Sequence, residues 1–326
     1  NYLVAFLCAS TLLAQSAPAS APTALPDISV IGNIMGSNNP LSVQEIEFSF
    51  QHYLYPSVKA NIFAALHKEE SGKRNFELEE AYVTFSDVMG VLMSNETSGI
   101  GIGATIGQKK IGFGKINALH PEQWDFVDRP LAIQQFLGGT EGVSAEGAQL
   151  TTLLPLPFFS QLETGYWKTV AHEEEGGEET HSGIEYSNQL ISARLWNGFG
   201  LSDTQEFTTG ISVLMGNTNA SAEKEKTQLL GVDFTYTHEL SNQKDLNIQA
   251  EYLHATYGDE GEAREVQTGG YVSGTYSLNP EYEVGARYDL LGKHGDEGST
   301  KTQWGLMATR QLTETSKFRV QYNGGE

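Results

Sequence analysis

Apolar and polar residues alternate with a period of two along most of the chain. In 246–252, Leu, Ile, Ala and Tyr occupy one face, and Asn, Gln and Glu occupy the other. The same pattern recurs in 230–237 and 282–290. This is the period of a β-strand with one apolar face. We therefore predict fifteen strands, near residues 27–35, 43–54, 57–68, 75–86, 100–110, 147–155, 158–168, 185–197, 206–215, 226–239, 244–256, 266–278, 281–292, 301–311 and 316–323.

The connections between these strands alternate in length. Short turns are expected at 55–57, 155–157, 241–244 and 278–281, and longer polar loops at 69–74, 111–146, 169–184, 216–225, 257–265 and 293–300. A soluble β-sandwich would show the same apolar alternation along its strands. Short turns on one side, long loops on the other and aromatic girdles are typical of outer-membrane barrels. Aromatic residues near strand ends are Tyr53, Tyr55, Trp167, Trp196, Tyr252 and Tyr276.

The fold class that follows is all-β, a transmembrane antiparallel β-barrel. Bacterial barrels of one chain have an even number of strands. Fifteen strands therefore predict about sixteen in the complete barrel, with a C-terminal strand missing after residue 326. The links 87–99 and 198–205 are long for turns, and strands within them would raise the count.

The N-terminal segment differs from the strands that follow. Residues 2–14 are largely apolar and are followed by a stretch rich in small residues, which indicates a secretory signal peptide over 1–22 and a barrel over 23–326. A buried N-terminal helix is the alternative. The single cysteine, Cys8, lies in this segment, and Leu7 before it argues against a lipoprotein. We expect a mature chain without thiols, as suits an exported protein.

One stretch, from Ile111 to Gly139, breaks the two-residue period. It belongs to the third long loop, 111–146, which corresponds by fold analogy to the porin loop that folds into the lumen. A loop this long is expected to be functional. We predict that its aromatic side chains pack against the wall and that its charged groups line a water path. The predicted constriction residues are Lys115, His120, Glu122, Asp125, Asp128 and Arg129.

Charged positions on the strands extend this prediction to the barrel wall. By strand phase, Lys109, Arg194 and Arg287 face the lumen as pore-lining residues. Pairing between opposite charges across the wall is the alternative, and it would give no selectivity. The net charge is −21, which excludes nucleic acid as an expected partner and favours cations.

A separate loop carries candidate metal ligands. The residues are His172, Glu173, Glu174, Glu175 and His181. Carboxylates and imidazoles bind divalent cations, although a solvated acidic loop has the same composition. No G-x-S-x-G motif is present, and the Gly-rich stretch 99–107 lacks the spacing of a dinucleotide fingerprint. We expect neither an enzyme nor a cofactor.

Three short motifs carry a family resemblance. They are FGKINALHP (113–121), FVDRP (126–130) and LEEAYVTF (78–85). The chain resembles, from about residue 27 to 195, Gram-negative outer-membrane barrels similar to phosphate-selective porins O and P. Some members of that family are labelled zinc-regulated or TonB-dependent outer-membrane proteins.

The resemblance and the strand pattern together imply a location in the bacterial outer membrane. They favour a passive, porin-like channel for ions or small hydrophilic solutes. A barrel for divalent metal (zinc) uptake or binding is the alternative, and a structural or adhesive barrel is the third. The implied partners are outer-membrane lipid and lipopolysaccharide and small solutes or ions, with divalent cations and a homotrimeric assembly as further candidates.

Overall fold

The computed structural model describes residues 2–10, 25–36, 41–68, 72–93, 101–139, 142–169, 186–218, 225–240, 243–258, 264–293 and 298–325. Its strands are β1 (Tyr2–Ser10), β2 (Asp27–Gly36), β3 (Ser42–Tyr55), β4 (Val58–Lys68), β5 (Arg74–Phe85), β6 (Ile102–Lys110), β7 (Ser144–Leu153), β8 (Phe159–Thr169), β9 (Tyr186–Ser202), β10 (Gln205–Thr218), β11 (Glu225–Leu240), β12 (Lys244–Tyr257), β13 (Glu265–Asn279), β14 (Tyr282–Leu291), β15 (Lys301–Thr313) and β16 (Ser316–Gly325).

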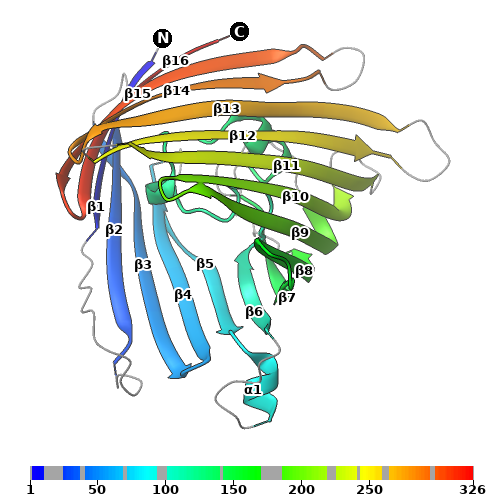
Figure 1. Ribbon diagram of the computed structural model, residues 1–326. Helices are drawn as coiled ribbons and strands as arrows, with labels where there is room; N and C mark the ends of the chain where they lie inside the picture. Colours follow the sequence, from blue (N-terminus) through cyan, green and yellow to red (C-terminus); the bar gives the residue numbers. More distant parts are fainter. Residues whose placement is uncertain are drawn as a thin grey trace.

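The strands form one antiparallel barrel in which sequence neighbours pair with each other (Figure 1). Strands β2 to β16 coincide with the fifteen strands predicted from the period of two. The all-β barrel prediction is therefore confirmed. The links 87–99 and 198–205 contain no additional strand in their described residues.

The sixteenth position of the ring is occupied by β1. It pairs with β16 from Tyr2↔Asn323 to Ala9↔Ser316, and with β2 from Ala5↔Gly36 to Ser10↔Ile31. The structure thus differs from the sequence prediction, which left this position to a strand beyond residue 326. An unbroken apolar segment suits both a signal peptide and a strand, so its pattern does not separate the two. The signal peptide over 1–22 stays a prediction.

The barrel is apolar outside and polar inside. Ile106, Tyr166 and Tyr252 are among many large apolar side chains that alternate along the strands and remain exposed. The positions between them carry buried polar groups such as Glu47 and Asp233. A soluble barrel has the reverse distribution, because its apolar face must avoid water. Apolar side chains on the outside are expected where lipid surrounds the barrel.

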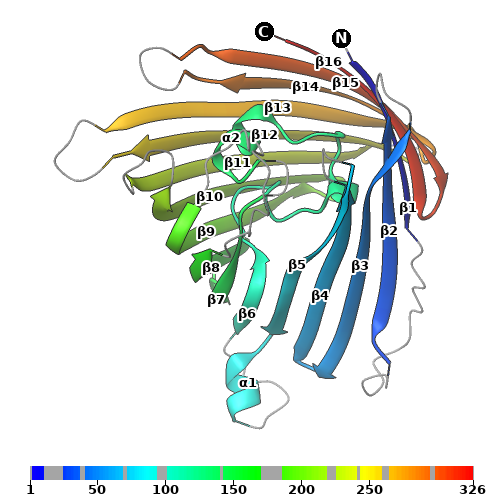
Figure 2. The same ribbon diagram turned by 180° about the vertical axis from the view of Figure 1, so that it is seen from behind.

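The segment between β6 and β7 lies inside the barrel (Figures 1 and 2). It contains the short helix η1 (Pro121–Gln123) and α2 (Leu131–Phe136), and α2 contacts β12, β13 and β14. We call residues 111–139 the inserted loop. In the structure this segment contacts the inner wall.

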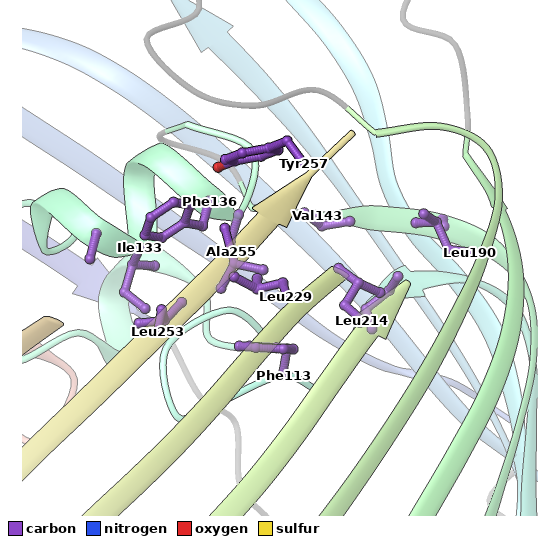
Figure 3. Packing of buried hydrophobic residues seen from close by; sticks show 14 of the residues in the cluster. Phe113, Ile133, Phe136, Val143, Leu190, Leu214, Leu229, Leu253, Ala255 and Tyr257 are labelled. Carbon is purple, nitrogen blue, oxygen red and sulfur yellow. The ribbon is translucent and has the colours of Figure 1, made fainter. Parts of the chain in front are cut away.

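The inserted loop supplies six of the seventeen described buried residues of an apolar cluster inside the barrel (Figure 3). Phe113, Ile133 and Phe136 are fully buried against Leu229 and Leu253 of the wall. Burying these side chains stabilises the loop by about 1.5–3 kcal/mol each. The expected burial of loop aromatics is therefore confirmed for Phe113 and Phe136.

One further helix, α1 (Val88–Leu92), begins at the end of β5. Asp87 caps it by accepting a hydrogen bond from the Gly90 amide. Among the described residues, no helix is both long enough and apolar enough to cross a bilayer.

Candidate functional site

The inserted loop enters the lumen through a close approach to the wall. Gly114 has φ +58°, and a Cβ atom at this position would collide with the carboxylate of Glu251 on β12. The Gly114 amide donates to the hydroxyl of Ser212 on β10. Glycine is needed here because a left-handed backbone and a buried wall contact coincide at this position.

Inside the lumen, Asn117 and Arg129 hold the loop in a compact shape. The Asn117 amide donates to the carbonyls of Ile111 and Val143, and its Oδ1 accepts from Arg129. Arg129 also donates to the carbonyls of Leu137 and Gly139. These bonds satisfy backbone groups that have no strand or helix partner.

Asp128 attaches the loop to the wall formed by β14, β15 and β16. Its carboxylate accepts hydrogen bonds from Arg287, Gln303, Gln321 and Asn323 at 2.6–3.0 Å. Arg287 also donates to the Asp128 carbonyl at 2.7 Å. We call this set of contacts the Asp128 anchor.

Two basic residues of β16 extend this attachment along the loop. Lys317 donates to the carbonyl of Glu122, and Arg319 donates to the carbonyl of Trp124, each at 2.7 Å. The β16 side of the barrel therefore holds the loop through backbone carbonyls as well as through Asp128. A loop anchored at several points has little freedom to leave the lumen.

The opposite end of the loop places His120 among carboxylates of β3 and β5. Its Nδ1 lies 2.7 Å from Glu47 Oε2 and 3.3 Å from Glu79 Oε2, and its Nε2 lies 3.3 Å from Glu80 Oε1. Phe63 stacks on the imidazole ring with a centroid distance of 4.9 Å. We call Glu47, Glu79, Glu80 and His120 the His120 cluster.

The His120 cluster contains charges of both signs, an imidazolium and the carboxylates that face it. Burial lowers the pKa of His120, but the facing carboxylates of Glu47, Glu79 and Glu80 outweigh burial and raise the pKa to about 11. The loop thus carries an imidazolium at neutral pH when only protein groups surround it. Elsewhere in the loop, burial raises the pKa of Glu122 and Asp125.

A second charged group lies where the loop faces β9 to β12. Lys115 donates to Thr208, and its ammonium lies 5.5 Å from the Trp196 ring centroid. Burial lowers the pKa of Lys115. Nearby, Arg194 pairs with Asp233 through two bonds of 3.1 Å. Opposite charges across the wall are therefore paired here, as the alternative sequence interpretation proposed.

A small cavity of about 30 Å³ lies between the loop and the wall. Trp124, Asp125 and Asp128 of the loop line it, together with Arg287 and Tyr271 of the wall. A cavity of this size holds about two water molecules. Polar groups of both the loop and the wall thus have access to water at this point.

The structure brings most of the predicted constriction residues into the lumen, but in different environments. Lys109 lies over the ring of Tyr82 on the inner wall. Arg129 is only 2% exposed, bonds within the loop and borders the small cavity. Arg287 is 4% exposed and binds Asp128 and Asp289. Their role in conduction stays a prediction.

The predicted site residues and those found in the structure do not fully coincide. The predicted metal loop, His172, Glu173, Glu174, Glu175 and His181, lies outside the described residues. Sequence reasoning missed Glu79, Glu80, Lys110 and Asn117. The motif containing Glu79 and Glu80 was noted only for its resemblance, because nothing in it indicated that the two carboxylates meet His120.

Comparisons with known proteins give the same architecture. No family model matches the chain. An uncharacterized protein of Aquifex aeolicus is 25% identical over 331 residues, which cover 86% of this chain and 67% of the relative. Among solved structures, the outer membrane channel DcaP of Acinetobacter baumannii is 12% identical with a TM-score of 0.52, covering 100% of this chain and 95% of that one.

Two further structures are similar. An anion-selective porin from Comamonas acidovorans is 9% identical with a TM-score of 0.56, covering 100% of this chain and 89% of the porin. OprB of Pseudomonas putida is 7% identical with a TM-score of 0.53, covering 99% of this chain and 93% of OprB. Identities this low show the fold alone. The chain has the fold of outer-membrane porin barrels.

Proposed function

We propose that the protein is a passive channel of the bacterial outer membrane for ions or small hydrophilic solutes, and that the inserted loop forms its constriction. The observation that carries this proposal is a structured loop held across the lumen of an apolar-outside barrel. The Asp128 anchor holds one side of the loop, and the His120 cluster lies at the other. A loop fixed at both ends sets the width and charge of the remaining path.

The fold likeness to DcaP, OprB and an anion-selective porin supports this proposal. The names of two of these structures describe an outer membrane channel and an anion-selective porin. The lumen of this chain is rich in carboxylates, so we propose cations rather than anions as the preferred ions. The sequence resemblance suggested a phosphate-selective pore. Such a pore would need basic side chains in the lumen that can bind the phosphate anion.

Reconstitution of the purified full-length protein into planar bilayers tests the proposal. We expect steady single-channel openings and an ohmic current without an energy source. Liposome swelling in small neutral sugars serves as a second measurement, because it reports solute passage without an electric field. A correctly assembled barrel that gives neither current nor swelling contradicts the channel proposal and favours a structural barrel.

A further inference from the structure

We propose that Glu47, Glu79 and His120 bind a divalent transition-metal ion of the zinc type on the inner wall of the barrel. The site lies where the inserted loop meets β3 and β5. It is separate from the acidic loop containing His172 and His181. The inference goes beyond the proposed channel and does not depend on conduction.

Three potential ligand atoms converge in the His120 cluster. Glu47, Glu79 and His120 each offer one ligand atom, and these atoms all lie within 4.8 Å of one another. Zinc binds imidazole nitrogen and carboxylate oxygen at about 2.0–2.2 Å. Tetrahedral ligands at that distance from one ion lie about 3.4 Å apart. The separation of 3.3 Å between His120 Nδ1 and Glu79 is close to this value, and the separation of 2.7 Å to Glu47 would widen by about 0.7 Å when an ion enters.

These atoms face one another without forming hydrogen bonds. The contacts of His120 Nδ1 are short, yet Nδ1, Glu47 Oε2 and Glu79 Oε2 lack hydrogen-bond partners in suitable directions. The side chains of Glu47 and His120 are only 3% and 8% exposed. Buried polar atoms without partners are costly. A shared ion would satisfy all three.

A β-bulge brings the carboxylates of Glu79 and Glu80 on β5 to the same face. Phe63 pairs with Glu80 and Ala64 pairs with Leu78, so Glu79 is an extra residue in the ladder. Successive residues of a regular strand face opposite sides. The bulge instead lets Glu79 and Glu80 both reach His120, at 3.3 Å each. Bulges often redirect a side chain beside a functional site.

Glu80 and Phe63 orient the imidazole for metal binding. Glu80 faces Nε2, whose proton it can accept, which leaves the lone pair of Nδ1 for the ion. Metal-binding histidines commonly donate their other ring nitrogen to a carboxylate in this way. Stacking on Phe63 limits rotation of the ring. Glu80 is therefore a positioning residue rather than a ligand.

The local charge leaves room for a dication. Glu47, Glu79 and Glu80 bring three negative charges, and Lys110 brings one positive charge at 3.7 Å from Glu79. The difference is −2 with a neutral His120. A protonated His120 is the alternative way to neutralise these carboxylates, because its proton offsets one negative charge. A zinc ion would displace that proton and offset two negative charges.

The choice of ion follows from the donor set. Calcium and magnesium prefer sites composed of oxygen ligands. Imidazole favours zinc and related transition metals. One nitrogen and two carboxylate oxygens, with a position left for water or solute, fit a three-ligand zinc site. Glu79 also lies 3.0 Å from His67. Glu79, His67 and Glu45 form a second group of side chains with the spacing of metal ligands.

Zinc titration of the purified full-length barrel tests the proposal. The protein is stripped with a chelator in detergent and titrated with zinc sulfate by calorimetry. We expect one zinc ion per chain at the His120 cluster. His120→Gln and Glu47→Gln should each weaken binding by more than about 100-fold, and Glu80→Gln by about 10–100-fold, as for other residues that orient a metal-binding histidine.

Matched variants distinguish zinc binding at the His120 cluster from unspecific zinc binding to other acidic side chains. Glu251→Gln removes another buried lumenal carboxylate, and His238→Gln removes another strand histidine, so both should keep zinc affinity. The His172→Gln, His181→Gln double variant should also keep it. Heat-modifiable gel mobility and circular dichroism show that each variant has assembled.

X-ray absorption of the zinc-loaded protein supplies a second measurement. We expect nitrogen and oxygen ligands with a single imidazole, and loss of the imidazole signal in His120→Gln. Absence of stoichiometric zinc binding by the wild type overturns the proposal and leaves His120 as an imidazolium. The proposal is also overturned if the assembled His120→Gln and Glu47→Gln variants bind zinc as tightly as the wild type does.

Discussion

Replacing Asp128 with alanine should release the inserted loop from the β14–β16 wall. The substitution removes four side-chain hydrogen bonds, one of which is the ion pair with Arg287. Removing one partner of a buried ion pair costs about 3–5 kcal/mol. The lower end applies, because the Asp128 side chain is 28% exposed and Asp289 still faces Arg287. A loss of about 3 kcal/mol shifts the docking equilibrium of the loop by about 150-fold.

Limited trypsin digestion measures this shift. Lys115 lies in the loop and donates to Thr208 in the docked state, so cleavage after it requires the loop to open. When opening is fast relative to cleavage, the rate follows the open population. We therefore expect cleavage at Lys115 to be faster in Asp128→Ala by up to about 150-fold, with noisier single-channel currents.

Asp203→Ala is the control, because Asp203 lies exposed in the turn between β9 and β10. It should leave both the digestion and the current unchanged. Equal cleavage rates in Asp128→Ala and the wild type would show that the Asp128 anchor does not hold the loop.

Three other predictions concern selectivity, stability and processing. Reversal potentials in a salt gradient should show cation preference, because acidic residues outnumber basic ones by 41 to 20, and clear anion selectivity would contradict this. Phe136→Ala should reduce the free energy of unfolding in detergent by about 3–5 kcal/mol, because Phe136 is fully buried in the apolar cluster, and an unchanged urea midpoint would count against that packing. Mass spectrometry of protein from outer membranes should place the mature N-terminus near residue 23, whereas retention of Tyr2–Ser10 would exclude the signal peptide and keep β1 in the barrel.

The strands were predictable from the sequence because each one separates two environments. Lipid on one side and a polar lumen on the other impose the two-residue period seen in β12 and β14. The inward position of residues 111–139 was also predictable, since so many aromatic residues in a long loop need a surface to cover them. The local pattern of apolar and polar residues therefore predicts most of the fold.

The arrangement of the site was not predictable in the same way. The bulge at Glu79 shifts the strand phase by one residue, so an unbroken alternation places Glu79 and Glu80 on opposite faces. Arg129 bonds to carbonyls of 137 and 139, a contact set by the folded path of the loop rather than by its sequence pattern. The strand β1 was missed because continuous apolarity has no two-residue period.

Deleting Ala118 to Gln135 tests the central claim, that the inserted loop constricts the lumen. The deletion removes the Asp128 anchor, His120 and most of α2, and leaves the barrel strands intact. Single-channel recordings should show a larger conductance and weaker ion selectivity than the full-length protein, with normal assembly on heat-modifiable gels. An assembled deletion variant whose conductance and selectivity equal those of the full-length protein would contradict the account.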